Sequence, residues 1–322
     1  MPPEGIAGKT FAVHDLAEFL RSPLRAALLY RFGIAREMYR DQSLEAAPPL
    51  GVPGGPVEWA LQDAWLEGDY DRAFRKMQLS GQVPTGYLGD FARAAFIGKA
   101  AEKEAEIRAF LADFGGEKRR ETVSLAAAGG HATFTCEVSN WGGDEDETTV
   151  WVTGVRGENA PPVRALEPFL AFLVHIAGAE DRERARELRL GVVDLRKVQT
   201  EAWRWSITPE AAADYLCELA RSWLAYLSTA DEGGRYIDFT YLKLAKALGG
   251  ARPDRADPDA FDWAGAAVEL AKEDSGYSGD APPARDLVID DRMADFRRDP
   301  SAEELKALYF ARYEQPLSAK GD

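Results

Sequence analysis

Cysteine is scarce in this sequence, with Cys136 and Cys217 the only two among 322 residues. They fall in segments that read as a strand and a helix, so they supply neither a disulfide framework nor a CxxC metal cluster. Long apolar runs are also missing, because no stretch approaches the roughly 18 apolar residues that span a bilayer. The N-terminus lacks the basic flank and apolar run of a signal peptide. We therefore expect a cytoplasmic protein that does not enter the membrane.

Positive charge is in deficit, since 39 Lys and Arg stand against 54 Asp and Glu, for a net charge of -15. A protein that grips DNA on its own normally carries a basic face. The acidic total argues against autonomous, tight DNA binding. It leaves room for a local basic strip, and it suits a piece that docks onto a more basic partner.

Residues for cofactor chemistry are few. The three histidines, His14, His131 and His175, are scattered without metal-ligand spacing. No Gly-rich GKS or GKT loop is present to hold nucleotide phosphates, and no Ser or Cys has a recognisable nucleophile elbow. We expect no cofactor. The apolar fraction of 46% is nonetheless that of a globular protein with a substantial core.

Helical periodicity dominates the first third of the chain. Leu16, Phe19 and Leu20 recur at helical spacing, and Pro23 can open a second helix, which predicts two short helices in tandem. Further helices are predicted at residues 57–65 and 70–79, and a long charged helix at about 90–114. The acidic and basic alternation in residues 182–189 indicates another exposed helix.

Strand periodicity begins near residue 121. Residues 121–126 and 131–138 flank a Gly-Gly hairpin signal, and 148–155 and 188–195 add strands on either side of a helix at 163–177. Trp203 and Trp205 share one face of a strand, as core or as a subunit interface. Helices are predicted near 208–227, 240–248, 259–271 and 302–313. The order predicts an α/β (α+β) fold, a mixed sheet flanked by helices with a helical N-terminal part.

The segment from Phe11 to Ile34 resembles the start of the RecC C-terminal domain, with its L-x-x-F-h-x-x-P-x-R-x-F-h-x-x-R-L-G-I pattern. Matching positions are Leu16, Phe19, Pro23, Arg25, Arg31, Gly33 and Ile34. The stretch 79–89 is similar to the family's G-x-L-P-x-G-x-F-G turn, and 208–216 to its T-P-E-x-A-x-x-Y-L helix. Two features depart from the pattern. The family's P-L-P-F stretch is missing at 231–239, and the loop at 144–147 is unusually acidic.

The resemblance implies a PD-(D/E)xK nuclease-like fold over one domain, residues 1–322, with a helical part (10–116), a sheet core (121–207) and a helical C-terminal part (208–322). The family's large helicase-like N-terminal regions are absent, so the chain is a fragment or a stand-alone relative. Nuclease chemistry needs an Asp on one strand and an acid and a Lys two positions apart on the next, to hold Mg²⁺ and position a water. Ser139 stands in the first Asp position, and Thr153 and Val155 in the other two. The resemblance therefore implies that the catalytic residues are lost.

Other carboxylates remain near these positions. Glu137 is expected to face solvent from its strand, and Asp194 to lie in a strand-end turn. The carboxylate clusters at 144–146 and 290–291 are expected on the surface. An active nuclease with a migrated metal site at Glu137 or Asp194 stays open as an alternative.

Two basic groups are candidates for contact with DNA. The first is Arg21, Arg25, Arg31 and Arg36, interleaved with aromatic residues, and its alternative is pairing with nearby acids. The second is Lys118, Arg119 and Arg120, whose alternative is a solvated helix end.

The resemblance implies a non-catalytic, DNA-guiding scaffold within exodeoxyribonuclease V, a RecBCD-type helicase-nuclease of double-strand break repair and recombination. Its partners would be a RecB-like beta subunit and a RecD-like alpha subunit, which house ATP hydrolysis and cleavage. An unrelated protein-interaction module, favoured by the acidic charge, is the third reading.

Overall fold

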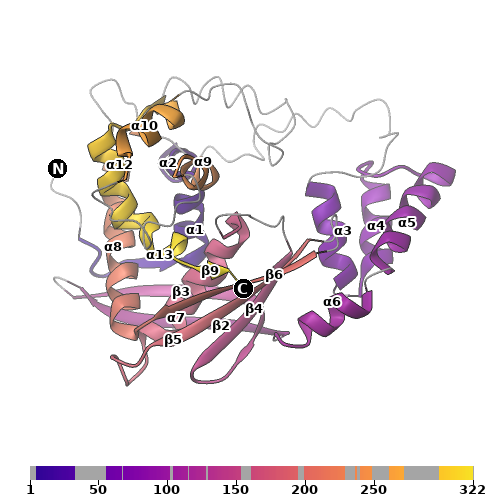
Figure 1. Ribbon diagram of the computed structural model, residues 1–322, viewed down its shortest axis with the longest axis horizontal. Coiled ribbons are helices and arrows are strands. Elements are labelled where there is room, and N and C mark those ends of the chain that lie inside the picture. The colour runs from indigo at the N-terminus through magenta and orange to yellow at the C-terminus, as the bar shows by residue number, and fades with distance from the viewer. Residues whose placement is uncertain are drawn as a thin grey trace.

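A mixed, seven-stranded β-sheet organises the molecule (Figure 1). The computed structural model describes residues 5–32, 56–66, 68–101, 104–114, 116–127, 130–153, 161–194, 199–228, 236–237, 240–248, 261–271 and 297–321. The strand order is β1-β3-β4-β5-β6-β9, with β2 paired to β3. The strands are β1 (Thr10–Ala12), β2 (Glu117–Ala127), β3 (Gly130–Gly143), β4 (Glu147–Thr153), β5 (Arg186–Asp194), β6 (Gln199–Ile207) and β9 (Lys320–Gly321).

The predicted hairpin is present, and so is the predicted helix between β4 and β5. β2 and β3 pair antiparallel from Ala127 opposite Gly130 as far as Glu117 opposite Trp141. β4 and β5 run parallel, and the chain passes between them through a helix, as parallel neighbours require. This confirms the predicted mixed sheet.

The main hydrophobic core lies on one face of the sheet, beneath α1 (Val13–Arg21), α2 (Pro23–Phe32), α7 (Leu166–Ala177) and α8 (Pro209–Ser228). The predicted tandem helices are thus confirmed. α7 is buried along almost its whole length, because it is nearly all apolar and lies between the sheet and its neighbouring helices. α8 begins as predicted: the backbone N–H of Ala211 donates to Thr208 Oγ1 at 3.3 Å, and Pro209 is its first residue.

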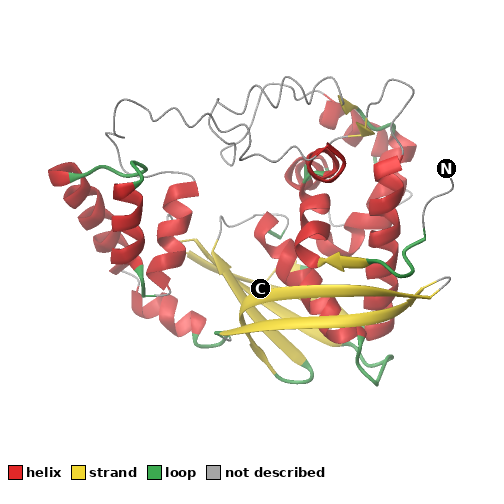
Figure 2. Ribbon diagram, turned by 180° about the vertical axis from the view of Figure 1, so that it is seen from behind, coloured by secondary structure: helices red, strands yellow, loops and turns green. Residues whose placement is uncertain are grey.

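A separate group of helices covers one end of the opposite face: α3 (Pro56–Leu66), α4 (Tyr70–Leu79), α5 (Gly86–Ala101) and α6 (Glu104–Leu111). Figure 2 shows this group at the end of the sheet remote from α8. Ile107 of α6 packs on Val193 of β5. The α6 segment and Phe114 can lie close to β5 because Gly191 has no side chain. A Cβ at Gly191 would lie 2.8 Å from Phe114 Cζ.

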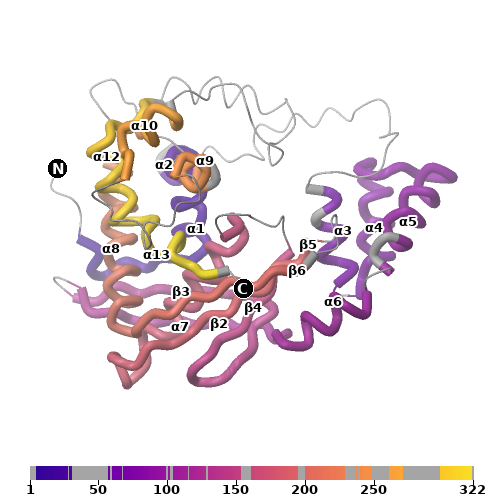
Figure 3. Tube along the Cα trace, in the orientation of Figure 1, coloured from indigo at the N-terminus to yellow at the C-terminus, as the bar shows by residue number. Residues whose placement is uncertain are grey.

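The C-terminal segments return to the main core. They are β7 (Tyr236–Ile237), α9 (Tyr241–Ala247), α10 (Trp263–Ala271), β8 (Arg297–Arg298), α12 (Ala302–Leu308), the π-helical turn η5 (Tyr309–Tyr313) and α13 (Glu314–Leu317). Tyr313 donates its hydroxyl hydrogen to the Leu20 carbonyl at 3.0 Å, which joins segments from opposite ends of the chain (Figure 3). Cys136 and Cys217 are buried free thiols. In the described part of the chain, no helix combines the length and the apolar composition needed to cross a membrane.

Three local predictions are wrong. The long helix at 90–114 is instead two, and the first begins at Gly86. Residues 182–189 are not a helix, since a loop leads into β5 at Arg186, where Leu188 and Leu190 satisfy the strand period of two. The basic residues 118–120 lie inside β2 rather than at a helix end, because the β2–β3 ladder extends to Glu117.

Candidate functional site

The candidate site lies at the end of β4, where the resemblance places the nuclease acid. Thr153 is the last residue of β4 and is buried. Its backbone pairs with Val193 of β5, whose side chain faces α6, so Thr153 also faces the α3–α6 side of the sheet. Its hydroxyl donates to Asp63 Oδ1 of α3. A helix distant in sequence therefore brings a carboxylate to this position.

A cation completes the group. Arg164 lies in the 3-10 turn η2 (Val163–Ala165), and its Nη1 donates to the Thr153 carbonyl oxygen at 3.1 Å and to Thr153 Oγ1 at 2.5 Å. The same nitrogen lies 3.5 Å from Asp63 Oδ2. We call Asp63, Thr153 and Arg164 the Thr153 cluster. Its one carboxylate and one guanidinium balance in charge.

This chemistry differs from that of a magnesium site. Mg²⁺ is held by carboxylates and waters, whereas the Thr153 cluster offers one carboxylate already beside a guanidinium. Ser139 is exposed in β3, and Val155 lies outside the described residues. Within the described ranges, no group of three or more His, Cys, Asp or Glu side chains is placed to hold a metal ion.

The two carboxylates of the alternative nuclease reading lie on opposite faces of the sheet. Glu137 follows Cys136, which faces the main core, and so points away from it, as predicted. Asp194 follows Val192 by two residues and shares its core-facing side, where it is buried. Since they point apart, Glu137 and Asp194 do not converge on one metal position.

Glu137 is bound by two cations. Lys118 Nζ lies 2.7 Å from Glu137 Oε1, and Arg120 binds Oε2. Hydrogen bonds from Lys118 and then Arg120, with their charges, lower the pKa of Glu137 to about 2. The carboxylate is therefore ionised at neutral pH, and the three side chains together keep a net positive charge on the exposed face of β2 and β3.

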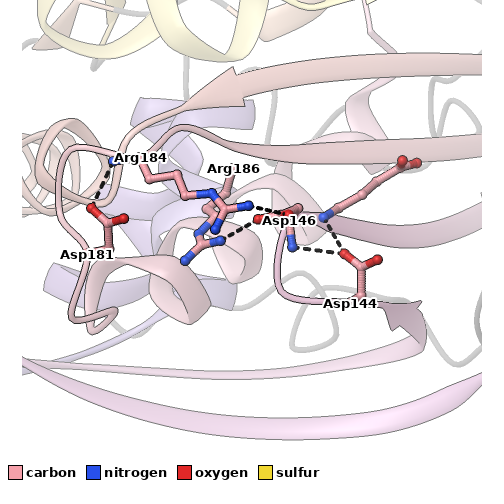
Figure 4. Close-up of polar contacts among 6 residues, drawn as sticks. Asp144, Asp146, Asp181, Arg184 and Arg186 are labelled. Atoms are coloured by element: carbon pink, nitrogen blue, oxygen red, sulfur yellow. Dashed lines mark hydrogen bonds and ion pairs between the residues drawn. The ribbon is translucent and has the colours of Figure 1, made fainter.

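The acidic loop between β3 and β4 is engaged in structural contacts (Figure 4). Asp146 binds Arg184 and lies 2.6 Å from Arg186 Nη1, while Asp181 accepts from the Arg184 backbone N–H at 3.3 Å. Asp144 Oδ1 accepts from the backbone N–H groups of Asp146 and Glu147 at 2.8 and 2.9 Å. These bonds lower the pKa of Asp144. The loop is therefore fastened to the entry of β5. The predicted pair at 290–291 lies outside the described residues.

The predicted DNA-contact residues do not form one surface. Arg21 binds Glu18 and lies 3.6 Å from Glu167, so it links α1 to α7. Arg25 and Arg31 lie in α2, and Arg36 lies outside the described residues. In β2 the basic run divides between the two faces: Lys118 and Arg120 share Glu137, whereas Arg119 binds Glu121 and stacks 5.6 Å from the Trp141 ring centroid.

Glu121 also binds a histidine. His175 Nδ1 of α7 lies 2.9 Å from Glu121 Oε1 and 3.0 Å from Oε2. Burial raises the pKa of Glu121, but the hydrogen bond and charge of His175, with Arg119, outweigh it and hold the pKa below its ordinary value. This group ties α7 to the edge of the sheet.

Asp63 and Arg164 were not singled out from the sequence. They lie far apart along the chain, and neither belongs to a motif that predicts their meeting at Thr153. Only the packing of α3 against β4 brings them together.

Comparison with known proteins gives one family. The family model described as RecC C-terminal domain matches residues 8–229, more than half of the chain. The search of curated proteins finds no match for this sequence.

Proposed function

The chain belongs to the family of RecC C-terminal domains, and from that premise we propose that it is a non-catalytic, DNA-guiding and scaffold domain of a RecBCD-type helicase-nuclease. The family links it to exodeoxyribonuclease V. In the proposal, the domain docks on a RecB-like beta subunit, within a complex that includes a RecD-like alpha subunit. It guides a separated DNA strand while the other subunits hydrolyse ATP and cut.

The Thr153 cluster carries the non-catalytic half of the proposal. The resemblance places a nuclease carboxylate at this strand end, and the one carboxylate that reaches it here, Asp63, is bound by the Thr153 hydroxyl and lies beside the Arg164 guanidinium. A fixed cation at this position opposes the binding of a divalent metal, because like charges in a partly buried place repel strongly. The position supports the fold instead of the reaction.

Charge supports the scaffold role. A net charge of -15 disfavours tight DNA binding by the chain alone, so the proposed role needs partner subunits to hold the DNA firmly. Lys118 and Arg120 supply an exposed positive group on β2 through which the domain would contact a strand backbone. Because the main core draws on residues from Ile6 to Ala319, we also propose that residues 1–322 form one domain.

Co-expression with a RecB-like beta subunit tests the proposal. We expect the chain to co-purify with that subunit, and the complex to bind and unwind linear duplex DNA with ATP. The double variant Lys118→Ala/Arg120→Ala should still assemble but bind DNA more weakly and with a shallower salt dependence, since phosphate contacts release counterions.

The matched control is Arg182→Ala/Arg221→Ala, which also removes two exposed cations, from a loop and from α8. It should leave DNA binding unchanged. Failure of the chain to associate with any RecB-like subunit would contradict the scaffold role. Equal DNA binding by the two double variants would refute the role of Lys118 and Arg120.

A further inference from the structure

An exposed apolar patch lies on the α4–α5 hairpin, the part of the molecule farthest from α8 (Figure 1). It consists of Leu79, Tyr87, Leu88 and Phe91, whose exposed fractions are 84%, 86%, 46% and 62%. We call it the α5 aromatic patch. The other exposed large hydrophobic residues in the described part of the chain, Leu29, Tyr30 and Val268, lie on other elements. Apolar side chains gathered in this way on a surface mark an interaction site.

The two aromatic rings lie on one face of α5. Tyr87 and Phe91 are four residues apart, so they are neighbours on the helix surface. The opposite face of α5 packs on α4, where Phe96 stacks on Tyr70 with ring centroids 4.8 Å apart. Because that packing fixes the rotation of α5, the Tyr87 and Phe91 rings are presented to solvent.

The hairpin that carries the patch is held firmly. Gln78 Nε2 donates to the Pro84 carbonyl at 3.1 Å, and Arg93 Nε donates to Asp71 Oδ1 at 2.9 Å. Gly81 and Gly86 take left-handed φ values of 72° and 61° that turn the chain between the helices. Because the hairpin is already held in place, less conformational entropy is lost when a ligand binds to it.

Positive charge lies on α4, the helix that packs against α5. Among the described residues, the side chains of Arg75 and Lys76 have no hydrogen-bond or ion-pair partner, and both residues are exposed. An open groove of about 380 Å³ between α4 and α5 is lined by Arg75 and Arg93 together with Asp71 and Asp90. In the segment 69–93 cations outnumber acids, in contrast to the acidic chain as a whole; they are Arg72, Arg75, Lys76 and Arg93 against Asp69, Asp71 and Asp90.

We propose that the α5 aromatic patch, with Arg75 and Lys76, is a binding platform for single-stranded DNA. Bases stack on Tyr87 and Phe91 while the two cations face the phosphates, a combination that accepts any base sequence. The proposal rests on the DNA-guiding function above and names a site for it apart from Lys118 and Arg120. A protein partner would suit Leu79 and Leu88 equally, but exposed cations on α4 together with solvent-facing rings on α5 favour a nucleic acid.

Fluorescence anisotropy with a short, fluorescein-labelled oligothymidylate and the full chain tests the platform. Tyr87→Ala/Phe91→Ala should weaken binding by about tenfold or more, since each lost base stack is worth a factor of this order. Tyr87→Phe/Phe91→Tyr keeps both rings and should bind like the natural chain. Arg75→Ala/Lys76→Ala should weaken binding and flatten its salt dependence.

Val268→Ala is the matched control, because it truncates an exposed apolar side chain on α10 instead. It should leave the affinity unchanged. A bromouracil-substituted oligonucleotide should cross-link to the peptide that contains Tyr87. Binding that survives Tyr87→Ala/Phe91→Ala, or absence of oligonucleotide binding by the natural chain, would overturn the platform.

Two outcomes separate this inference from the proposed function. If only Lys118→Ala/Arg120→Ala weakens DNA binding, the platform is refuted while the DNA-guiding role stands. If Tyr87→Ala/Phe91→Ala instead prevents assembly with a RecB-like subunit and leaves oligonucleotide binding intact, the patch is a protein interface and the inference is refuted.

Discussion

Arg164 contacts Thr153 twice through a single nitrogen, since Nη1 lies 3.1 Å from the threonine carbonyl oxygen and 2.5 Å from its hydroxyl. The contact joins the last residue of β4 to the turn that begins the crossover helix α7. The resemblance described above places a metal ligand of the PD-(D/E)xK nucleases at this strand end. In this chain, Arg164 and Thr153 fasten the start of the crossover to the end of β4. We therefore expect both side chains to stabilise the fold.

A double-mutant cycle measures that contribution. Thr153→Val removes a buried hydroxyl and should lower the free energy of unfolding by about 1 kcal/mol, because its hydrogen bonds to Asp63 and Arg164 are lost. Arg164→Ala should lower the free energy of unfolding by roughly 0.5 to 1 kcal/mol less in the Thr153→Val background than in the natural chain. Urea unfolding supplies all four values.

Ser139→Ala is the control for this cycle, because Ser139 is exposed and a change there should stay within about 0.5 kcal/mol. Purely additive effects of Thr153→Val and Arg164→Ala would show that the two side chains are not coupled.

Glu121 gives stability a pH dependence. His175 and Arg119 hold the pKa of Glu121 below its ordinary value despite burial, which by itself raises it. A lowered carboxyl pKa stabilises the fold fully above the unfolded pKa of about 4.3, and the gain is lost as pH falls through the folded value. The difference in unfolding free energy between the natural chain and Glu121→Gln should therefore shrink as pH drops below about 4.3.

Urea unfolding from neutral to acidic pH measures this difference. Glu145→Gln, at an exposed position in the β3–β4 loop, should show no comparable trend. If the difference in unfolding free energy between the natural chain and Glu121→Gln grew toward acidic pH, the lowered pKa of Glu121 would be contradicted.

Arg312 is a buried cation held by aromatic rings. It is 6% exposed, and its guanidinium carbon lies 4.6 Å from the Phe19 centroid and 5.4 Å from that of Tyr226. Burial lowers its pKa, and its Nε and Nη1 have no hydrogen-bond partner among the described residues. Arg312→Met loses the contacts of the guanidinium, but it also removes the cost of burying a charge. The substitution should therefore lower the unfolding free energy by at most about 1 kcal/mol, or raise it.

Arg312→Ala, which also removes the packed stem, should cost about 2 to 4 kcal/mol. Thermal and urea unfolding of both variants checks the comparison. A large loss of stability in Arg312→Met would show that the charge itself stabilises the core.

The sheet and most helices could be predicted because their signals are local. Thr208 and Pro209 mark the start of α8, and alternating apolar residues mark the strands. Residues 182–189 were misread because alternating charges suit an exposed helix, whereas tertiary pairing places Arg186 in a strand beside Asp146. β1 and β9 were missed because they are short edge pairings with too few residues to show a period.

The candidate site was only half predictable. The loss of acids at Ser139 and Thr153 follows from residue type once a register is assumed. Which side chains surround Thr153 cannot be predicted in this way. Asp63 reaches Thr153 only through the packing of α3, and Arg164 reaches it through the 3-10 turn before α7. Likewise, the run 118–120 reads as one basic patch until strand alternation sends Arg119 to the other face.

Gly89 allows the close approach of the α4–α5 hairpin. A Cβ at this position would overlap the Pro84 carbonyl oxygen and Gln78 Nε2, whereas one at Gly98 in the same helix meets nothing within 4 Å. Gly89→Ala should lower the unfolding free energy by about 1 to 3 kcal/mol, while Gly98→Ala should be neutral or stabilise by up to about 1 kcal/mol. Urea unfolding distinguishes them, and equal effects would contradict the close contact.

The most direct test of the account is a nuclease assay on the purified chain, with end-labelled linear duplex and single-stranded DNA and Mg²⁺. We expect the DNA to be recovered at full length, and Glu137→Gln and Asp194→Asn to behave like the natural chain. Mg²⁺-dependent shortening of the DNA that either substitution abolishes would contradict it, because an active metal site would then exist in this sheet.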